Sequence, residues 1–156
     1  MDADRGPALA APSPLARARA DQVATLYASW PRTTASMLFG GALFCTAMWG
    51  QAPPALMAAW LALVVANQGW RRLLVRAWRR AHPGPSAMRR WGCYWSVGST
   101  AAGSLWGIAA ITMFPGSPAH QALSIVCLFG VVLGGLNLTA VYKPSFYGFV
   151  LPALVP

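Results

Sequence analysis

Residues 91–114 read WGCYWSVGSTAAGSLWGIAAITMF, and residues 119–142 read AHQALSIVCLFGVVLGGLNLTAVY. Neither stretch of 24 residues contains an Asp, Glu, Lys or Arg, and a Pro-Gly-Ser-Pro turn separates the two. At about 1.5 Å per residue, such a helix reaches about 36 Å, which exceeds the hydrocarbon thickness of a bilayer, about 30 Å. The pair therefore predicts two membrane-spanning helices joined by a short turn.

The composition of the whole chain of 156 residues agrees with this prediction. Hydrophobic residues make up 56% and charged residues 10%, and the mean hydropathy is +0.47. A soluble domain carries about 25% charged residues, so this chain has too little polar surface to cover a globule in water. We predict an all-α fold, a polytopic transmembrane helical bundle with four full spans and a truncated fifth. The predicted spans cover residues 33–49, 55–70, 91–114, 119–142 and, in part, 145–156.

The fifth apolar run begins at Ser145 and reaches Pro156 after 12 residues. A helix of that length is about 18 Å long, which does not cross a bilayer. A chain that ended at this depth would bury uncapped carbonyl groups and a carboxylate. We therefore expect the sequence to be a fragment of a longer chain, with its last run at the membrane interface or disordered.

The region before the first span divides into two parts. Residues 1–14 are rich in Ala and Pro, and we predict a disordered tail there. Over residues 15–30, apolar residues recur at steps of three and four, while Arg17 and Asp21 occupy the other face. This pattern predicts an amphipathic helix in the headgroup region, or alternatively a soluble helix that packs on another domain. The transmembrane region then covers residues 31–156.

The net charge is +9, and most of the cations lie in one connection between apolar runs. Such a cluster is typical of a cytoplasmic loop and sets the orientation of the spans, because Lys and Arg are retained inside. We expect this connection and the N-terminus to lie in the cytoplasm. Arg71 and Arg72, the first two arginines of the connection, should lie at or beyond the membrane interface, with stems that extend to water. Nucleic acid is not a predicted partner, because no basic soluble domain is present. The topology-setting residues are Arg71, Arg72, Arg76, Arg79, Arg80, Arg89 and Arg90.

The sequence predicts no catalytic, cofactor-binding or metal-binding residue. Every acidic residue precedes the first span, so no pair of carboxylates can serve acid–base chemistry within it. His82 and His120 lie in connections on opposite sides of the predicted membrane. The three cysteines lie apart in apolar runs, without metal-ligand spacing, and we interpret them as packing residues: Cys45, Cys93 and Cys127.

Polar side chains and small residues within the spans indicate helix packing. The most polar candidates are Asn67, Gln68, Asn137 and Thr139, which can bond between helices or line a transport path. Ladders of small residues at four-residue spacing let helix backbones approach closely. We expect them to pack the third span on the fourth, or alternatively to form a homodimer. The predicted helix-packing residues are Ser99, Gly103, Gly107, Gly130 and Gly134.

Several phrases give the chain a resemblance to a known family. They include ADQVATLYASWP, MWGQAPP, RRLLVRAWRRA, WSVGSTAAGSLWGIAAITMFPGSPAHQ and YKPSFYGFVLPALVP, and they extend over residues 20–156. Together they resemble the N-terminal membrane region that precedes GGDEF diguanylate cyclase domains, with or without EAL domains, in bacterial signalling proteins. A similar region precedes some sensor histidine kinases.

The resemblance implies a sensory or anchoring input module of about six spans in the bacterial inner membrane. A catalytic output domain that makes cyclic-di-GMP would follow it in the cytoplasm, and no catalytic residue carries over to this chain. The sequence names no sensed ligand; its predicted partner is the lipid bilayer. The alternatives are the membrane region of a sensor histidine kinase, a small transporter or channel subunit, and a structural anchor.

Overall fold

The computed structural model describes residues 13–155, apart from the side chains of residues 85 and 136–139. Over this range the fold is all-α: six α-helices and one short 3-10 turn, with no strand among the described residues. The predicted tail, residues 1–14, falls almost entirely outside the described residues. Its last two residues do not belong to a tail, since Ser13 caps the first helix and Pro14 begins it.

Proline and glycine set the helix boundaries. α1 (Pro14–Ala28) gives way to α2 (Trp30–Ala47) at a bend, because Pro31 has no N–H to continue the first helix. α3 (Pro54–Ala81) follows Pro53 and ends where His82 adopts a left-handed conformation, with φ of 42°. The prediction that the second span continues as a helix beyond residue 70 is confirmed. The short turn η1 (Pro85–Ala87) then leads into α4 (Met88–Thr112).

The last two helices differ from the expectation. α5 (Pro118–Thr139) ends before the predicted residue 142, because Tyr142 is extended and Pro144 sits in the first turn of a new helix. α6 (Lys143–Leu154) is a regular helix that packs closely along α4. Of the two expected states of this run, at the membrane interface or disordered, disorder is therefore wrong over residues 143–154. Its two prolines, Pro144 and Pro152, do not prevent helix formation.

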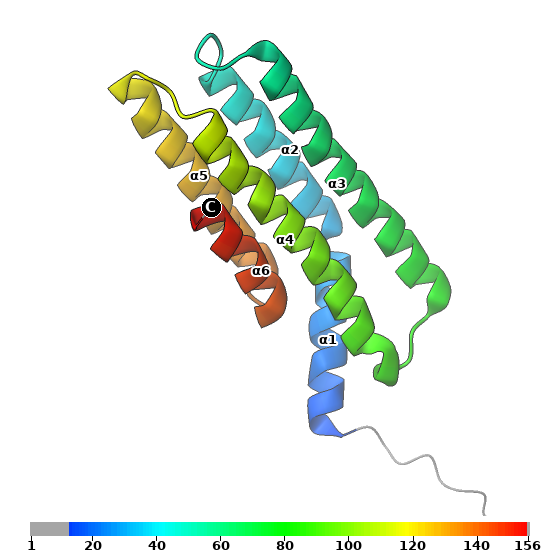
Figure 1. Ribbon diagram of the computed structural model, residues 1–156. Helices are drawn as coiled ribbons and strands as arrows, with labels where there is room; N and C mark the ends of the chain where they lie inside the picture. The colour runs from blue at the N-terminus through cyan, green and yellow to red at the C-terminus, as the bar shows by residue number, and fades with distance from the viewer. Residues whose placement is uncertain (1–12, 156) are drawn as a thin grey trace, which may run out of the picture.

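Figure 1 shows the helices side by side in an up-and-down bundle. The α2–α3 and α4–α5 connections lie at one end, here called the hairpin end. The α3–α4 and α5–α6 connections and α1 lie at the other, here called the arginine end. All eleven Lys and Arg residues of the described range lie outside the two hairpin-end connections, residues 48–53 and 113–117.

Two hydrophobic cores lie one above the other in the bundle. The hairpin-end core contains residues of all five helices from α2 through α6. At its centre lie Phe44, Trp60 and Trp106, whose ring centroids are 5.0–5.6 Å apart. The arginine-end core joins α1, α3 and α4 around Tyr27 and Trp95. Trp60 also donates a hydrogen bond to the Leu105 carbonyl at 2.7 Å, which ties α3 to α4.

The outer surface of the bundle is also apolar. Each helix from α2 to α6 leaves large hydrophobic side chains exposed, among them Phe39 at 72% and Val126 at 67%. By length and composition, however, only one described helix is apolar enough to cross a membrane: the stretch Pro118–Gly135 of α5, with mean hydropathy 1.5. The hydropathy of the other helices is lower, because their apolar stretches contain arginine or many Gly, Ser, Trp and amide residues. The four full spans therefore stay a prediction.

Candidate functional site: a buried polar layer around Arg71

Arg71 points into the bundle because it belongs to the buried stripe of α3. The stripe recurs at three- and four-residue steps, which place its members on one face of a helix. Its members are Met57, Trp60, Val64, Gln68, Arg71, Leu74 and Val75. The prediction that Arg71 extends to water is wrong, because Arg71 is 3% exposed, whereas its neighbour Arg72 lies exposed on the bundle surface. The periodicity of α3 already carried this signal.

The guanidinium of Arg71 is held by one hydrogen bond and one ring. Its Nη2 donates to the Ser99 hydroxyl at 3.0 Å, and its carbon Cζ lies 4.8 Å from the Trp95 ring centroid. Gly98 faces the Arg71 side chain, and a Cβ there would lie 3.5 Å from Nε, at van der Waals contact. Within the described part of the chain, Nε and Nη1 have no hydrogen-bond partner.

Other polar contacts lie at the same level of the bundle. Ser99 shares a hydrogen bond of 2.7 Å with Ser145 of α6 and donates to the Trp95 carbonyl at 3.2 Å. Thr34 of α2 donates to the Gln68 side chain at 3.2 Å, and Asn67 donates to the Gly98 carbonyl at 3.2 Å. We call these residues the polar layer: Thr34, Asn67, Gln68, Arg71, Ser99 and Ser145.

The polar layer separates the two cores on every helix that contributes to it. On α3 it lies between Val64 of the hairpin-end core and Leu74 of the arginine-end core. On α6 it lies between Phe149 of the first core and Tyr142 of the second. Because Arg71 bonds Ser99 of α4 and Ser99 bonds Ser145 of α6, a shift of α4 or α6 relative to α3 changes the contacts of Arg71. α2 joins the layer through Gln68 instead.

Aromatic rings of α1, α3 and α4 close the layer toward the arginine end. Tyr27 stacks on Trp78 with centroids 4.9 Å apart and lies at the same distance from Trp95. Its hydroxyl donates to the Trp91 carbonyl at 3.0 Å. Burial, with a smaller contribution from Tyr94, raises the pKa of the Tyr27 phenol. Tyr27 is therefore a neutral hydrogen-bond donor that ties α1 to the bundle.

Burying Arg71 in this way costs free energy. Moving a charge out of water costs roughly several kcal/mol unless a counter-charge compensates it. Asp21, the only acidic residue among residues 13–155, is exposed on α1. An arginine stays protonated in proteins, so Arg71 is no acid or base catalyst; what it can do is hold a positive charge and donate hydrogen bonds.

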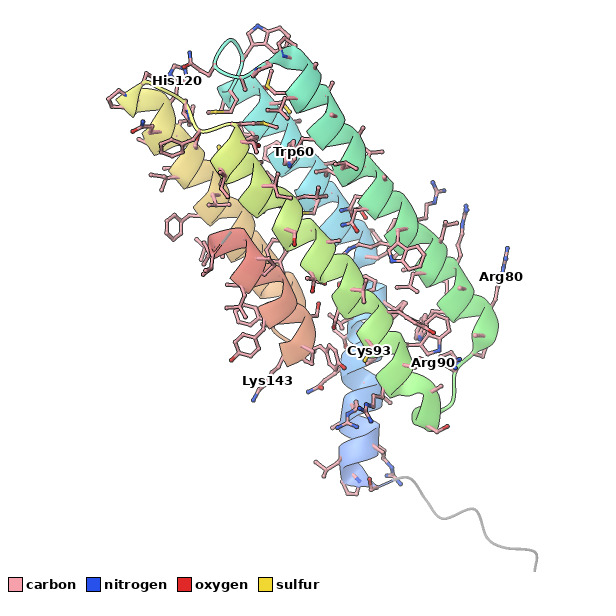
Figure 2. All side chains as sticks on the ribbon, in the orientation of Figure 1. Trp60, Arg80, Arg90, Cys93, His120 and Lys143 are labelled. Atoms are coloured by element: carbon pink, nitrogen blue, oxygen red, sulfur yellow. The ribbon has the colours of Figure 1, made fainter. Side chains whose placement is uncertain are left out.

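The other predicted topology-setting residues lie on the surface. Arg72, Arg76, Arg79, Arg80, Arg89 and Arg90 are all exposed. Figure 2 shows Arg80 and Arg90 at the arginine end, with Lys143 at the start of α6. The structure thus brings these cations to one end of the bundle, and their role in membrane orientation stays a prediction.

The predicted helix-packing residues do not pack α4 on α5. Ser99, Gly103 and Gly107 are buried, and Gly103 faces α6, where a Cβ would overlap the backbone carbonyl of Phe149. The expected pairing is wrong because α6 lies over this face of α4. Gly134 faces Ser36 of α2, and a Cβ at Gly130 would meet nothing within 4 Å. No described contact tests the alternative of a homodimer.

The remaining candidates are dispersed. Cys45 is half-buried, Cys93 exposed and Cys127 buried, each with a free thiol. Among the described residues, no three His, Cys, Asp or Glu residues lie close enough to hold a metal ion. The side chains of Asn137 and Thr139 fall outside the described part of the structure, whereas Asn67 and Gln68 do bond between helices, as their polarity predicted.

No protein-family model, curated protein or solved structure matches the chain. The features that bear on its function are the polar layer, the outer surface and the sequence phrases.

Proposed function

We propose that the chain is a multi-pass helical module of the bacterial inner membrane. In this proposal it is the N-terminal input region of a signalling protein. Its N-terminus and arginine end face the cytoplasm, and its hairpin end faces outward. The output is a diguanylate cyclase that makes cyclic-di-GMP, and a histidine kinase is the alternative output. The choice of output rests on the resemblance of the sequence phrases.

One observation supports membrane placement most strongly: the apolar outer surface combined with cations at one end. Soluble monomers rarely expose apolar patches larger than a few hundred Å². Here α2 to α6 all expose large aliphatic or aromatic side chains, including Leu63, Ile108 and Leu151. A lipid environment removes the cost of that exposure, and cytoplasmic retention of arginine orients the bundle.

The polar layer favours an input module over a passive anchor. An anchor needs no buried, incompletely bonded arginine, because an apolar residue of the same size packs at lower cost. In the proposed orientation Arg71 lies at the cytoplasmic end of α3's crossing, where a stimulus that moves α4, or α6 through the Ser145–Ser99 bond, changes its bonds. Transmission between sites requires an element with two arrangements, and in this proposal the observed bonds of Arg71 are one of them.

The same residue gives the transporter alternative one observation in its favour. Ionisable residues inside membrane bundles often mark substrate or ion paths. The sequence alone offered no such residue, but the structure buries Arg71 between α3 and α4. Reconstitution in liposomes separates the two: an input module gives no ion or substrate flux, and a transporter does.

The gene beyond the codon for Pro156 tests the proposed output. A reading frame that continues into a further span and a GG[DE]EF segment supports the cyclase, and a histidine-kinase core supports the alternative. A stop codon contradicts both. With a cyclase present, Arg71→Met in the full-length protein is expected to change cellular cyclic-di-GMP. The matched control Arg72→Met, at an exposed neighbouring position, leaves it unchanged.

A further inference from the structure

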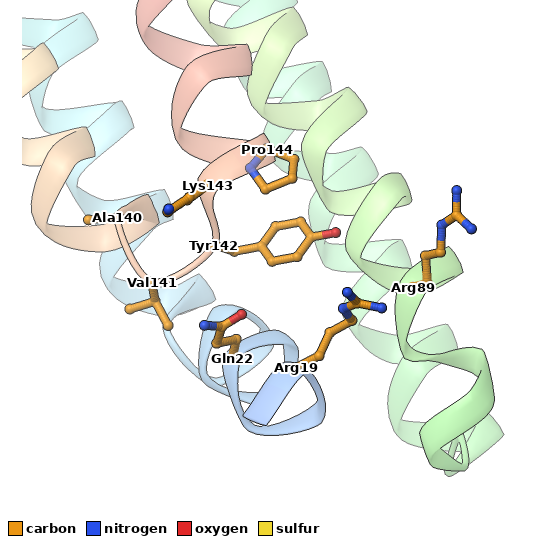
Figure 3. Close-up of a pocket in the computed structure, with 8 residues that line it drawn as sticks. All are labelled: Arg19, Gln22, Arg89, Ala140, Val141, Tyr142, Lys143 and Pro144. Carbon is orange, nitrogen blue, oxygen red and sulfur yellow. The ribbon is translucent and has the colours of Figure 1, made fainter. Parts of the chain in front are cut away.

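A basic pocket lies at the arginine end between α1, α4 and the start of α6. It has a volume of about 530 Å³, and its polar lining includes Arg19 and Gln22 of α1, Arg89 of α4, and Tyr142 and Lys143. In Figure 3, Arg19 and Gln22 extend from α1 toward Tyr142, whereas the exposed Arg89 side chain, on the adjacent stretch of α4, extends away from Arg19. The Lys143 ammonium points to the other side of Tyr142, on an exposed side chain.

The charges of this pocket are complementary to an anion. Its lining includes three cations and no carboxylate. Arg19 and Gln22 are three residues apart and share one face of α1, whereas Asp21 is about 200° around the helix from Arg19. Phosphate is an anion that such a mixture of guanidinium, ammonium, amide and phenol donors can bind.

A second hollow adjoins the basic pocket and is apolar. It is a groove of about 660 Å³ along the outside of α4, and it shares Arg89, Tyr142 and Pro144 with the pocket. It follows one helix face from Cys93 to Ser104. Eleven residues of helix rise about 16 Å, which is close to half of the hydrocarbon thickness of a bilayer, about 30 Å.

We propose that pocket and groove together bind one anionic phospholipid of the cytoplasmic leaflet. The basic pocket holds the phosphate headgroup, and the groove holds an acyl chain. The two hollows match the two chemically different parts of one lipid. The basic pocket lies at the arginine end, where the headgroup would be, and the groove runs from it for about half of the hydrocarbon thickness. This inference rests on the proposed membrane orientation, in which the arginine end faces the cytoplasm. It deepens the proposed function by placing a lipid headgroup between α1, α4 and the start of α6.

The test is a binding titration of the purified, delipidated chain, followed by native mass spectrometry. The probes are phosphatidylglycerol, phosphatidylcholine and inorganic phosphate, each added alone. The chain is first shown to resist carbonate extraction, so a soluble chain refutes the proposed function before the lipid site is tested. The charge variant is Arg19→Gln with Arg89→Gln, and its matched control is Arg76→Gln with Arg80→Gln, which removes two exposed cations outside both hollows.

We expect phosphatidylglycerol to bind at least about 10-fold more tightly than phosphatidylcholine. At about five-fold for each cation near the headgroup, the charge variant should weaken phosphatidylglycerol binding about 30-fold, and the control less than about three-fold. Filling the groove with Ala101→Phe should also weaken it, unlike Ala66→Phe on the exposed face of α3.

Equal binding of the two lipids, or full binding by the charge variant, overturns the proposal. Inorganic phosphate that binds as tightly as phosphatidylglycerol, with no effect of Ala101→Phe, also overturns it and assigns the pocket to a soluble phosphate compound. The altered positions are all exposed, and helical circular dichroism verifies that each variant remains folded.

Discussion

Replacing Arg71 with methionine should stabilise the bundle, although it removes two favourable contacts. The lost hydrogen bond to Ser99 is worth about 1.5–3 kcal/mol and the contact with Trp95 about 2 kcal/mol. The substitution also removes two costs of the wild-type arginine. A buried charge without a counter-ion costs roughly several kcal/mol, and each of the donors Nε and Nη1 that lacks a partner costs about 1–3 kcal/mol. Ser99 keeps its bonds to Ser145 and the Trp95 carbonyl. We therefore expect a net gain of about 1–4 kcal/mol.

The assay is reversible unfolding of the purified chain in mixed micelles, with the free energy of unfolding compared between variants. Arg72→Met is the control, because Arg72 is exposed, and its expected change is within about 0.5 kcal/mol. Arg71→Lys keeps the charge but loses the planar fork that bonds Ser99 and stacks on Trp95, so it should destabilise the chain. A loss of stability in Arg71→Met as large as that in Arg71→Lys would refute the reasoning that Arg71 is retained at a cost.

Three further predictions concern single contacts. Gly103→Leu should destabilise the chain by about 3 kcal/mol or more in the same unfolding assay, because a Cβ at this position overlaps the Phe149 backbone. In the control Gly130→Leu the new side chain meets open space, and the free energy of unfolding should change by less than about 0.5 kcal/mol. Tyr27→Phe should cost about 1–2 kcal/mol at neutral pH through the lost bond to the Trp91 carbonyl. Burial raises the pKa of the Tyr27 phenol above its unfolded value of about 10, so the stabilisation by Tyr27 is complete below pH 10 and is lost as the pH rises beyond 10. The stabilities of the wild type and of Tyr27→Phe should therefore converge in an alkaline titration. Parallel curves would contradict this.

The helices of this fold could be predicted from local sequence signals. Prolines, among them Pro53 and Pro54, and the Pro-Gly pairs at residues 83–84 and 115–116 mark where helices begin and end. Proline restricts the backbone and glycine permits turn conformations wherever they occur. Long runs of apolar residues gave the helix positions to within about three residues at most ends. That chemistry is local, so it needs no knowledge of the neighbouring helices.

The partners of each helix could not be predicted in the same way. Gly103 was recognised as a close-packing position, but a small residue does not specify which backbone approaches it, and α6 lies there instead of α5. Arg71 was interpreted from its charge, although its place in the buried stripe of α3 argued for the interior. The basic pocket joins Arg19, Arg89 and Lys143, which are far apart in sequence, so only the fold brings them together.

Membrane orientation is the claim on which the proposed function depends, and cysteine accessibility tests it most directly. In a background with Cys45, Cys93 and Cys127 replaced by alanine, single cysteines are introduced at Gln51, His82 and Ser117. Intact cells expressing the chain are then treated with a membrane-impermeant maleimide. We predict that the cysteines at positions 51 and 117 react in intact cells and that the one at position 82 reacts only after permeabilisation. Labelling of all three positions in intact cells, or recovery of the chain in the soluble fraction, would contradict a bundle that crosses the membrane with its arginine end in the cytoplasm.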